Sequence, residues 1–200
     1  MIAIINYGLG NLHSVQKAAA YVGGNAVVSD NPQVIFGAEK VILPGVGAFS
    51  AGMKGLESRG LVNVIREVVT LGKPLLGICL GMQLLFQESE EQGYHPGLGL
   101  LPGKVVPFQQ FDIKVPQIGW NQLEVMKKSN LMLDVQQSEY VYFNHGYYCI
   151  PNERSDVLTM TDYGTRFASS VERNNIFGVQ FHPEKSQKVG LRILKNFMEL

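Results

Sequence analysis

The sequence predicts an α/β protein with a mostly parallel central sheet flanked by helices, followed by a β-rich second half. Three observations lead to this fold class. In the first half, short apolar runs alternate with longer stretches of helical periodicity, as in strand–helix–strand units. Glycine or proline follows several of these runs and marks where they end. In the second half, strand-like runs follow one another until a single closing helix.

The first half contains the elements of a parallel sheet. Its apolar runs are short and continuous, which is typical of strands that are buried on both faces. The expected strands are residues 2–5, 26–28, 41–43 and 74–78. The expected helices are residues 12–22, residues 52–71 with a break near Gly60, and one that opens at residues 82–86.

The second half is expected to differ in character. Residues 87–117 are rich in Gly, Pro and Gln, which favours a long loop with short strands. The β-rich runs that follow are residues 141–150, 157–161, 167–171 and 176–181, and the closing helix is residues 186–200. The chain contains no linker, repeat or low-complexity tract, so we expect one domain, residues 1–200.

Composition excludes several classes of protein. The 17 basic and 17 acidic side chains give a formal charge of zero without a basic stripe, so we expect no nucleic-acid partner. No apolar run approaches the roughly 20 residues of a membrane span, and residues 1–6 lack the pattern of a signal peptide. Two Cys do not make a disulfide framework. We therefore expect a cytoplasmic protein that does not bind a membrane.

No cofactor or metal is predicted. Gly8 and Gly10 stand between a strand and a helix, where a dinucleotide fingerprint would lie, but His13 occupies the position that must be small. The His and Cys residues lack the spacing of zinc ligands. We interpret the glycines as an ordinary turn.

The strongest motif surrounds Cys79. Residues 77–81 (Gly-Ile-Cys-Leu-Gly) lie between a strand and a helix and match a nucleophile elbow with Cys in place of Ser. Such a turn exposes the nucleophile at the end of the sheet, where the helix N-terminus favours a thiolate and the N–H of Leu80 faces a developing oxyanion. A lone Cys is more often buried and inert, and this remains our interpretation of Cys149.

A thiol nucleophile needs a base, and His182 is the strongest of the four His residues. It ends a strand, and Pro183 and Glu184 follow it. In extended geometry His182 and Glu184 point the same way, so the carboxylate is placed to orient the imidazole, as in a nucleophile–base–orienter triad. His13 and His95 fit solvated or packing roles, whereas His145 stands at a strand bend and could line a site.

Residues 44–47 (Pro-Gly-Val-Gly) form a third part of this arrangement. They follow the third expected strand, and the carboxyl ends of neighbouring parallel strands line one crevice. The loop is thus expected beside Cys79, with backbone N–H groups available to an oxyanion. An ordinary strand-end turn has the same composition.

At this point the chain resembles the class I, or triad, glutamine amidotransferases. The resemblance rests on residues 44–47, 77–83 and 181–184 and extends over the whole chain. It is greatest to the glutaminase subunits of imidazole glycerol phosphate synthases, through residues 7–11, 118–121, 142–145 and 185–186.

This resemblance implies both a reaction and its site. Cys79 would attack the side-chain amide of L-glutamine, and His182, oriented by Glu184, would move the protons that release ammonia and then glutamate from a thioester. The implied substrate-binding residues are Gly45, Val46, Gly47, Leu80, Gln83, Gly146 and Tyr147.

The resemblance also implies a partner. Ammonia would pass to a cyclase subunit with a (β/α)₈ barrel, in a heterodimer that forms imidazole glycerol phosphate and an aminoimidazole carboxamide ribotide in histidine biosynthesis. The implied partner-facing residues are Asn11, Trp120, Tyr142 and Lys185, although a partly buried Trp120 would also fit a packing role.

Other interpretations stay open at this stage. Gln117, Asn144 and Gly146 depart from the usual residues of the subunit, and some bacteria carry a second copy that feeds ammonia to another synthase, for example in surface-sugar biosynthesis. A stand-alone Cys hydrolase would use the same triad. A catalytically dead binding subunit would lack a triad member, and none is missing.

Overall fold

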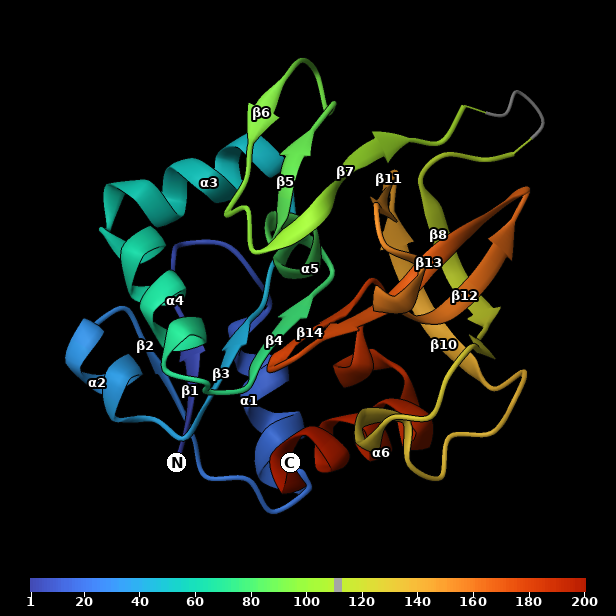
Figure 1. Ribbon diagram of the computed structural model, residues 1–200. Coiled ribbons are helices and arrows are strands. Elements are labelled where there is room, and N and C mark those ends of the chain that lie inside the picture. Colours follow the sequence, from blue (N-terminus) through green and yellow to red (C-terminus); the bar gives the residue numbers. More distant parts are fainter. Residues whose placement is uncertain (110–112) are drawn as a thin grey trace.

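A computed structural model describes residues 1–109 and 113–200, and its centre is a sheet of eight strands (Figure 1). The sheet order is β2-β1-β3-β4-β14-β13-β12-β9. The parallel part consists of β2 (Ala26–Ser29), β1 (Ile2–Ile5), β3 (Lys40–Leu43), β4 (Leu75–Ile78) and β14 (Ile176–Val179). The antiparallel part consists of β13 (Thr165–Arg173), β12 (Val157–Tyr163) and β9 (Glu124–Val125). The predicted α/β class and the mostly parallel sheet are confirmed.

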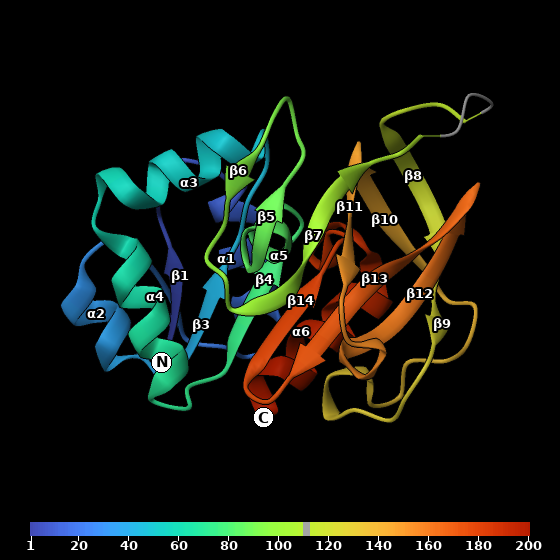
Figure 2. The same ribbon diagram turned by 45° about the horizontal axis from the view of Figure 1, so that its top comes forward.

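The position of β14 joins the two halves of the chain. This late strand inserts beside β4, with Val179 opposite Ile78 in the parallel register (Figure 2). Residues that follow the two strands therefore leave the sheet side by side, although about a hundred positions separate them in the sequence.

Helices cover both faces of the sheet (Figures 1 and 2). They are α1 (Leu12–Tyr21), α2 (Pro32–Gly37), α3 (Phe49–Ser58), α4 (Leu61–Thr70), α5 (Leu80–Leu84) and α6 (Gln187–Glu199). Alternate residues of β1 enter two apolar clusters: Ala3 and Ile5 pack with the α3–α4 side, and Ile2 and Ile4 pack with the α1–α6 side. This double burial is the reason for the continuous apolar run in the sequence.

Two helix predictions met different outcomes. The expected break near Gly60 is present, because Gly60 adopts φ 66° between α3 and α4, a conformation that suits glycine. The helix expected to open at residues 82–86 begins instead at Leu80 and ends at Leu84. The chain then turns into β5 (Phe86–Ser89), where Phe86 is fully buried in the core.

Helix α2 was not expected, although its sequence carries a start signal. The side chain of Asn31 caps the helix by accepting from the N–H of Gln33 at 2.9 Å, and Pro32 occupies the first turn.

Two smaller sheets complete the second half. One has the order β11 (Tyr147–Pro151), β7 (Leu101–Pro107), β5 and β6 (His95–Pro96), and the other pairs β10 (Tyr140–His145) with β8 (Gln117–Gln122). Single turns of 3-10 helix are η1 (Asn130–Met132), η2 (Arg154–Asp156) and η3 (Pro183–Lys185). The expected loop at residues 87–117 thus contains a full seven-residue strand, β7, and residues 110–112 within it lie outside the described residues.

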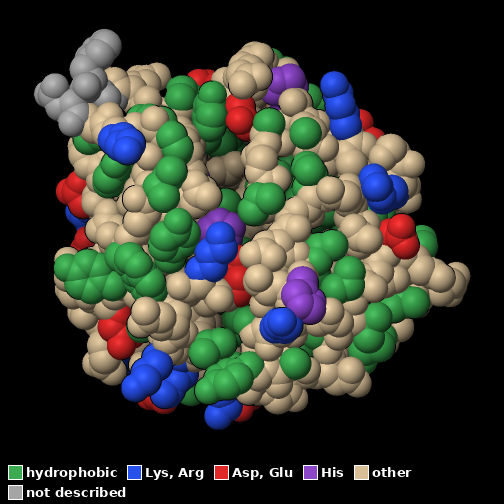
Figure 3. Space-filling view, turned by 180° about the vertical axis from the view of Figure 1, so that it is seen from behind, with side chains coloured by type: hydrophobic (Ala, Val, Ile, Leu, Met, Phe, Trp, Pro, Cys, Tyr) green, Lys and Arg blue, Asp and Glu red, His purple; other side chains and the backbone are tan. Residues whose placement is uncertain are grey.

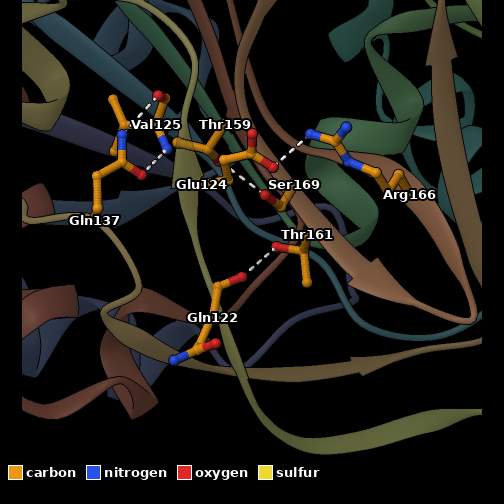
Figure 4. A network of polar contacts seen from close by, with 8 residues as sticks. All are labelled: Gln122, Glu124, Val125, Gln137, Thr159, Thr161, Arg166 and Ser169. Atoms are coloured by element: carbon orange, nitrogen blue, oxygen red, sulfur yellow. Dashed lines mark hydrogen bonds and ion pairs between the residues drawn. The ribbon is translucent and has the colours of Figure 1, made fainter.

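A polar network stabilises the antiparallel end of the main sheet (Figure 4). Glu124 and Arg166 form an ion pair between β9 and β13, and the side chain of Gln137 bonds to the backbone of β9. In the same network, the buried hydroxyls of Thr159 and Ser169 lie 2.8 Å apart.

Among the described residues, no helix is long and apolar enough to cross a membrane.

Candidate active site

Cys79 occupies a strained turn between β4 and α5. Its backbone has φ 54° and ψ −111°, a conformation that non-glycine residues rarely adopt. The neighbouring glycines make this turn possible. A Cβ on Gly77 would lie 2.7 Å from the backbone of Met82, and a Cβ on Gly81 would lie 1.8 Å from the carbonyl oxygen of Leu43. The structure therefore has the sharp elbow that the spacing of residues 77–81 predicts.

A backbone carbonyl and a side-chain amide lie near the sulfur of Cys79. Its Sγ lies 3.8 Å from the carbonyl oxygen of Asn144 and 3.8 Å from Nε2 of Gln180. Helix α5 is five residues long and begins directly after Cys79.

His182 and Glu184 form a buried pair beside the elbow. Nδ1 of His182 lies 2.9 Å from Oε1 of Glu184, and the two side chains are 2% and 1% exposed. The contact forms across the 3-10 turn that starts at Pro183, and not along an extended strand, because β14 already ends at Val179. With Nδ1 taken by Glu184, Nε2 is the ring nitrogen left to face the sulfur of Cys79.

The charge state of His182 follows from these neighbours. Burial alone would lower the pKa of the imidazole, but hydrogen bonding and Coulombic attraction to Cys79 and Glu184 outweigh burial and raise the pKa to about 10. Negative charge on the sulfur and the carboxylate thus stabilises a proton on the ring.

The predicted loop at residues 44–47 lies beside the elbow. Gly45 is buried, and a Cβ there would lie 2.4 Å from Oη of Tyr7 and 2.8 Å from Cβ of Leu80. Tyr7 in turn donates to the carbonyl oxygen of Pro44 at 2.7 Å. Gly47 adopts φ 105° and has open space around it. The loop is consequently anchored at Pro44 and unobstructed at Gly47.

Cys79 opens into a cavity of about 220 Å³. Six of the seven predicted substrate-binding residues line it, namely Val46, Gly47, Leu80, Gln83, Gly146 and Tyr147. The seventh, Gly45, does not line the cavity and packs behind it. Four further lining residues were not among the predicted substrate-binding residues: Glu91, Pro116, Asn144 and His145.

Glu91 and Gln83 place acceptors in this cavity. Glu91 comes from the turn after β5, and its Oε2 accepts from the backbone N–H of Phe49 at 2.7 Å. The side-chain nitrogen of Gln83 donates to the carbonyl oxygen of Tyr147 and to Oε1 of Gln180, both at 3.0 Å. Both N–H groups of Gln83 are therefore used, and within the described parts of the chain its oxygen is the polar atom left for the cavity. No pattern in the sequence indicates Glu91, because its position depends on the turn after β5.

His145 lies at the bend between β10 and β11, as its sequence context suggested. Its Nδ1 donates to the carbonyl oxygen of Tyr147 at 2.8 Å, and its Nε2 lies 2.9 Å from the side-chain amide of Gln117. Burial lowers the pKa of His145 to about 4. The hydrogen bond to Tyr147 acts in the opposite direction, and the nearby charge of His182 lowers the pKa further. The ring stays neutral near pH 7 and has a positioning role in the cavity wall.

Three of the four predicted partner-facing residues form one group. Trp120 on β8 is 46% exposed and packs edge-on against Tyr142 of β10, with ring centroids 6.0 Å apart. The ammonium of Lys185 lies 5.6 Å from the centroid of the Tyr142 ring. Figure 3 shows hydrophobic side chains gathered on the side of the molecule where β8 and β10 lie. Asn11 precedes α1, a helix that packs against the 3-10 turn holding Lys185.

Comparison with known proteins agrees with this geometry. A family model described as glutamine amidotransferase class-I matches residues 3–200. The chain is 53% identical to the imidazole glycerol phosphate synthase subunit HisH of Moorella thermoacetica, across 100% of this chain and 94% of that protein. It is 50% identical to the subunit of the same name from Syntrophotalea carbinolica across the whole of both.

Solved structures share the fold at lower sequence identity. A crystal structure described as a glutamine amidotransferase superimposes with a TM-score of 0.78 and 20% identity over the full length of both chains. The structure of PurLQS from Thermotoga maritima contains a chain that superimposes with a TM-score of 0.73 and 20% identity over 99% of this chain.

Proposed function

The chain belongs to the class I glutamine amidotransferase family, and we propose that it is the glutaminase subunit of an imidazole glycerol phosphate synthase. The observation that carries the proposal is the elbow thiol of Cys79 at a small cavity beside the buried His182–Glu184 pair. Full-length relatives at about 50% identity support the choice of synthase. They favour this subunit over a paralogue that serves another pathway.

The first half of the reaction forms a thioester. The sulfur of Cys79 attacks the side-chain amide carbon of glutamine, and the carbonyl oxygen becomes an oxyanion. The N–H of Leu80, at the start of α5, lacks an intrahelical partner and is available to this oxyanion, together with the Gly45–Val46 backbone. His182 gives its proton to the leaving nitrogen, the C–N bond breaks, and ammonia departs.

The second half of the reaction regenerates the thiol. Water attacks the thioester carbon while His182 accepts a proton from it, and the C–S bond breaks to release glutamate. Glu184 holds Nδ1 of the ring at 2.9 Å and stabilises the imidazolium that forms in each half.

Recognition of glutamine follows from the acceptors in the cavity. The free oxygen of Gln83 and the carboxylate of Glu91 suit the α-ammonium group of the substrate. The backbone of Gly146 and Tyr147 forms the opposite wall. A volume of about 220 Å³ fits a single amino acid better than a peptide, which disfavours a stand-alone peptidase.

The ammonia is consumed by a partner. We assign this role to a cyclase subunit with a (β/α)₈ barrel that docks against the surface of Asn11, Trp120, Tyr142 and Lys185. Together the subunits would form imidazole glycerol phosphate and the aminoimidazole carboxamide ribotide.

A single variant tests the proposal. Cys79→Ser in the complex with the cyclase should abolish synthesis from glutamine and leave synthesis from free ammonia intact. Loss of both activities would count against a separable ammonia donor, and unchanged glutamine use would exclude Cys79 as the nucleophile. Hydrolysis of glutamine with and without the cyclase separates a synthase subunit from an independent hydrolase, since only the subunit depends on its partner.

A further inference from the structure

Gln180 is a buried polar residue that the mechanism above does not use. It follows β14, is 0% exposed, and its backbone N–H donates to the carbonyl oxygen of Ser169 at 2.9 Å. Its side chain lies between Gln83 and the sulfur of Cys79. A buried amide is costly unless its donors and acceptors have hydrogen-bond partners. The partners of this amide therefore show which of its atoms faces the sulfur.

A backbone carbonyl fixes the direction of both amides. The oxygen of Tyr147 can only accept, so Gln83 must present its nitrogen there, at 3.0 Å. The second N–H on that nitrogen then reaches Oε1 of Gln180, also at 3.0 Å. With its oxygen occupied, Gln180 must turn its own nitrogen toward the sulfur, at 3.8 Å. The chain of bonds therefore ends in a donor to Cys79.

The contacts of the sulfur with Asn144 and Gln180 favour different protonation states. The carbonyl oxygen of Asn144 can only accept, and it therefore pairs with the S–H of the neutral thiol. The N–H of Gln180 can only donate, and a donor binds an anionic sulfur more strongly than a neutral one. When the proton leaves, the contact with Asn144 is lost and the contact with Gln180 strengthens.

We propose that Gln180 stabilises the anionic, attacking form of the Cys79 sulfur by N–H···S donation, and that Gln83 and Tyr147 align it for this task. This arrangement gives Gln83 a second role beside substrate binding. The inference rests on the proposed role of Cys79 as nucleophile.

The test measures the reactivity of the sulfur without glutamine. Alkylation of the full-length protein by iodoacetamide is followed against pH, and peptide mass spectrometry separates Cys79, which lines the cavity, from Cys149, since both are buried. Gln180→Leu removes the donor at similar size. Gln180→Glu keeps an acceptor for Gln83 but places an acid beside the sulfur. Ser169→Ala is the matched control, because it removes a buried hydroxyl from the adjacent strand without contact to Cys79.

The expected result is a shift in the pH midpoint of Cys79 alkylation. The midpoint should rise by about one unit in Gln180→Leu, which is a roughly tenfold lower rate below the midpoint, and by at least as much in Gln180→Glu. Ser169→Ala should keep the wild-type midpoint.

Each other outcome has a distinct meaning. Midpoints that stay at the wild-type value in both Gln180 variants would overturn the inference, and a shift of the same size in Ser169→Ala would assign the effect to general loosening. If Gln180→Leu does not fold, Gln180→Met, which also removes the donor without adding a charge, takes its place, because the acid of Gln180→Glu would raise the midpoint by itself. If Cys79 of the wild type reacts no faster than Cys149, the proposed function fails instead.

Discussion

The glycine at position 81 offers a sharp test of the elbow. Replacing it with alanine adds a Cβ 1.8 Å from the carbonyl oxygen of Leu43, and real Cβ contacts essentially never fall below 3.0 Å. The obstacle is backbone in β3, which cannot rotate away, so the turn that carries Cys79 must retreat by more than 1 Å. A misplacement of about 1 Å at reacting groups lowers a rate by roughly 100-fold.

We therefore expect Gly81→Ala to lose about 100-fold in glutamine hydrolysis in the presence of the cyclase. It should also lower the free energy of unfolding by about 1–3 kcal/mol, as overpacking does. Coupled glutamate detection measures the first effect and thermal or denaturant unfolding measures the second.

Gly37→Ala is the matched control. It lies in α2, its backbone is not left-handed, and a Cβ there meets nothing within 4 Å. We expect wild-type activity and a stability equal to or slightly above wild type. If Gly81→Ala hydrolyses glutamine as fast as Gly37→Ala, the close approach of β3 to the elbow does not position the nucleophile.

Three further predictions follow from the same contacts. Glu184→Gln removes the charge that supports the imidazolium, so kcat should fall by roughly 10³–10⁴ with KM little changed; a steady-state comparison that finds kcat intact would exclude the orienting role. The pKa of folded His182 lies at about 10, above its value of about 6.5 in an unfolded chain, so this group contributes stability that is fully present below about pH 6.5 and is lost as the pH rises toward 10. The unfolding midpoint of the wild type should fall across that window and that of Cys79→Ser less so; parallel curves would contradict the coupling. Lys185→Glu reverses the charge above the Tyr142 ring and should weaken association with the cyclase by roughly tenfold in titration calorimetry, with Lys188→Glu on the exposed start of α6 as the comparison variant.

Local sequence patterns predicted those parts of the fold that leave a mark in a few neighbouring residues. The apolar runs of β1, β3 and β4 are buried on both faces, so their continuity was sufficient to identify them. The break at Gly60 and the elbow at Cys79 were also predictable, because both depend on backbone angles that only certain residues allow.

Long-range pairing decided the parts that were mispredicted. Strand β7 lies in a segment rich in Gly, Pro and Gln, and it is a strand because β5 and β11 pair with its two edges. The helix at residues 82–86 was expected to continue, but burial of Phe86 in the core overrides its local preference.

The site residues also divide into those that a local motif predicts and those that only long-range pairing places. Cys79, His182 and Glu184 stand in motifs with their own local geometry, and the structure brings them together. Glu91 and Gln180 carry no such motif. They reach the site only through the turn after β5 and the register of β14 against β4, which a single sequence does not reveal.

The insertion of β14 between β4 and β13 has a consequence for synthesis on the ribosome. Until about 180 residues have emerged, β4 has one unpaired edge and the thiol of Cys79 has no base, so a nascent chain can neither complete its sheet nor hydrolyse glutamine. Glutamine hydrolysis by a nascent chain is thereby delayed until β14 and His182 have been synthesised. The same exposed edge makes truncated chains prone to pair with one another and aggregate.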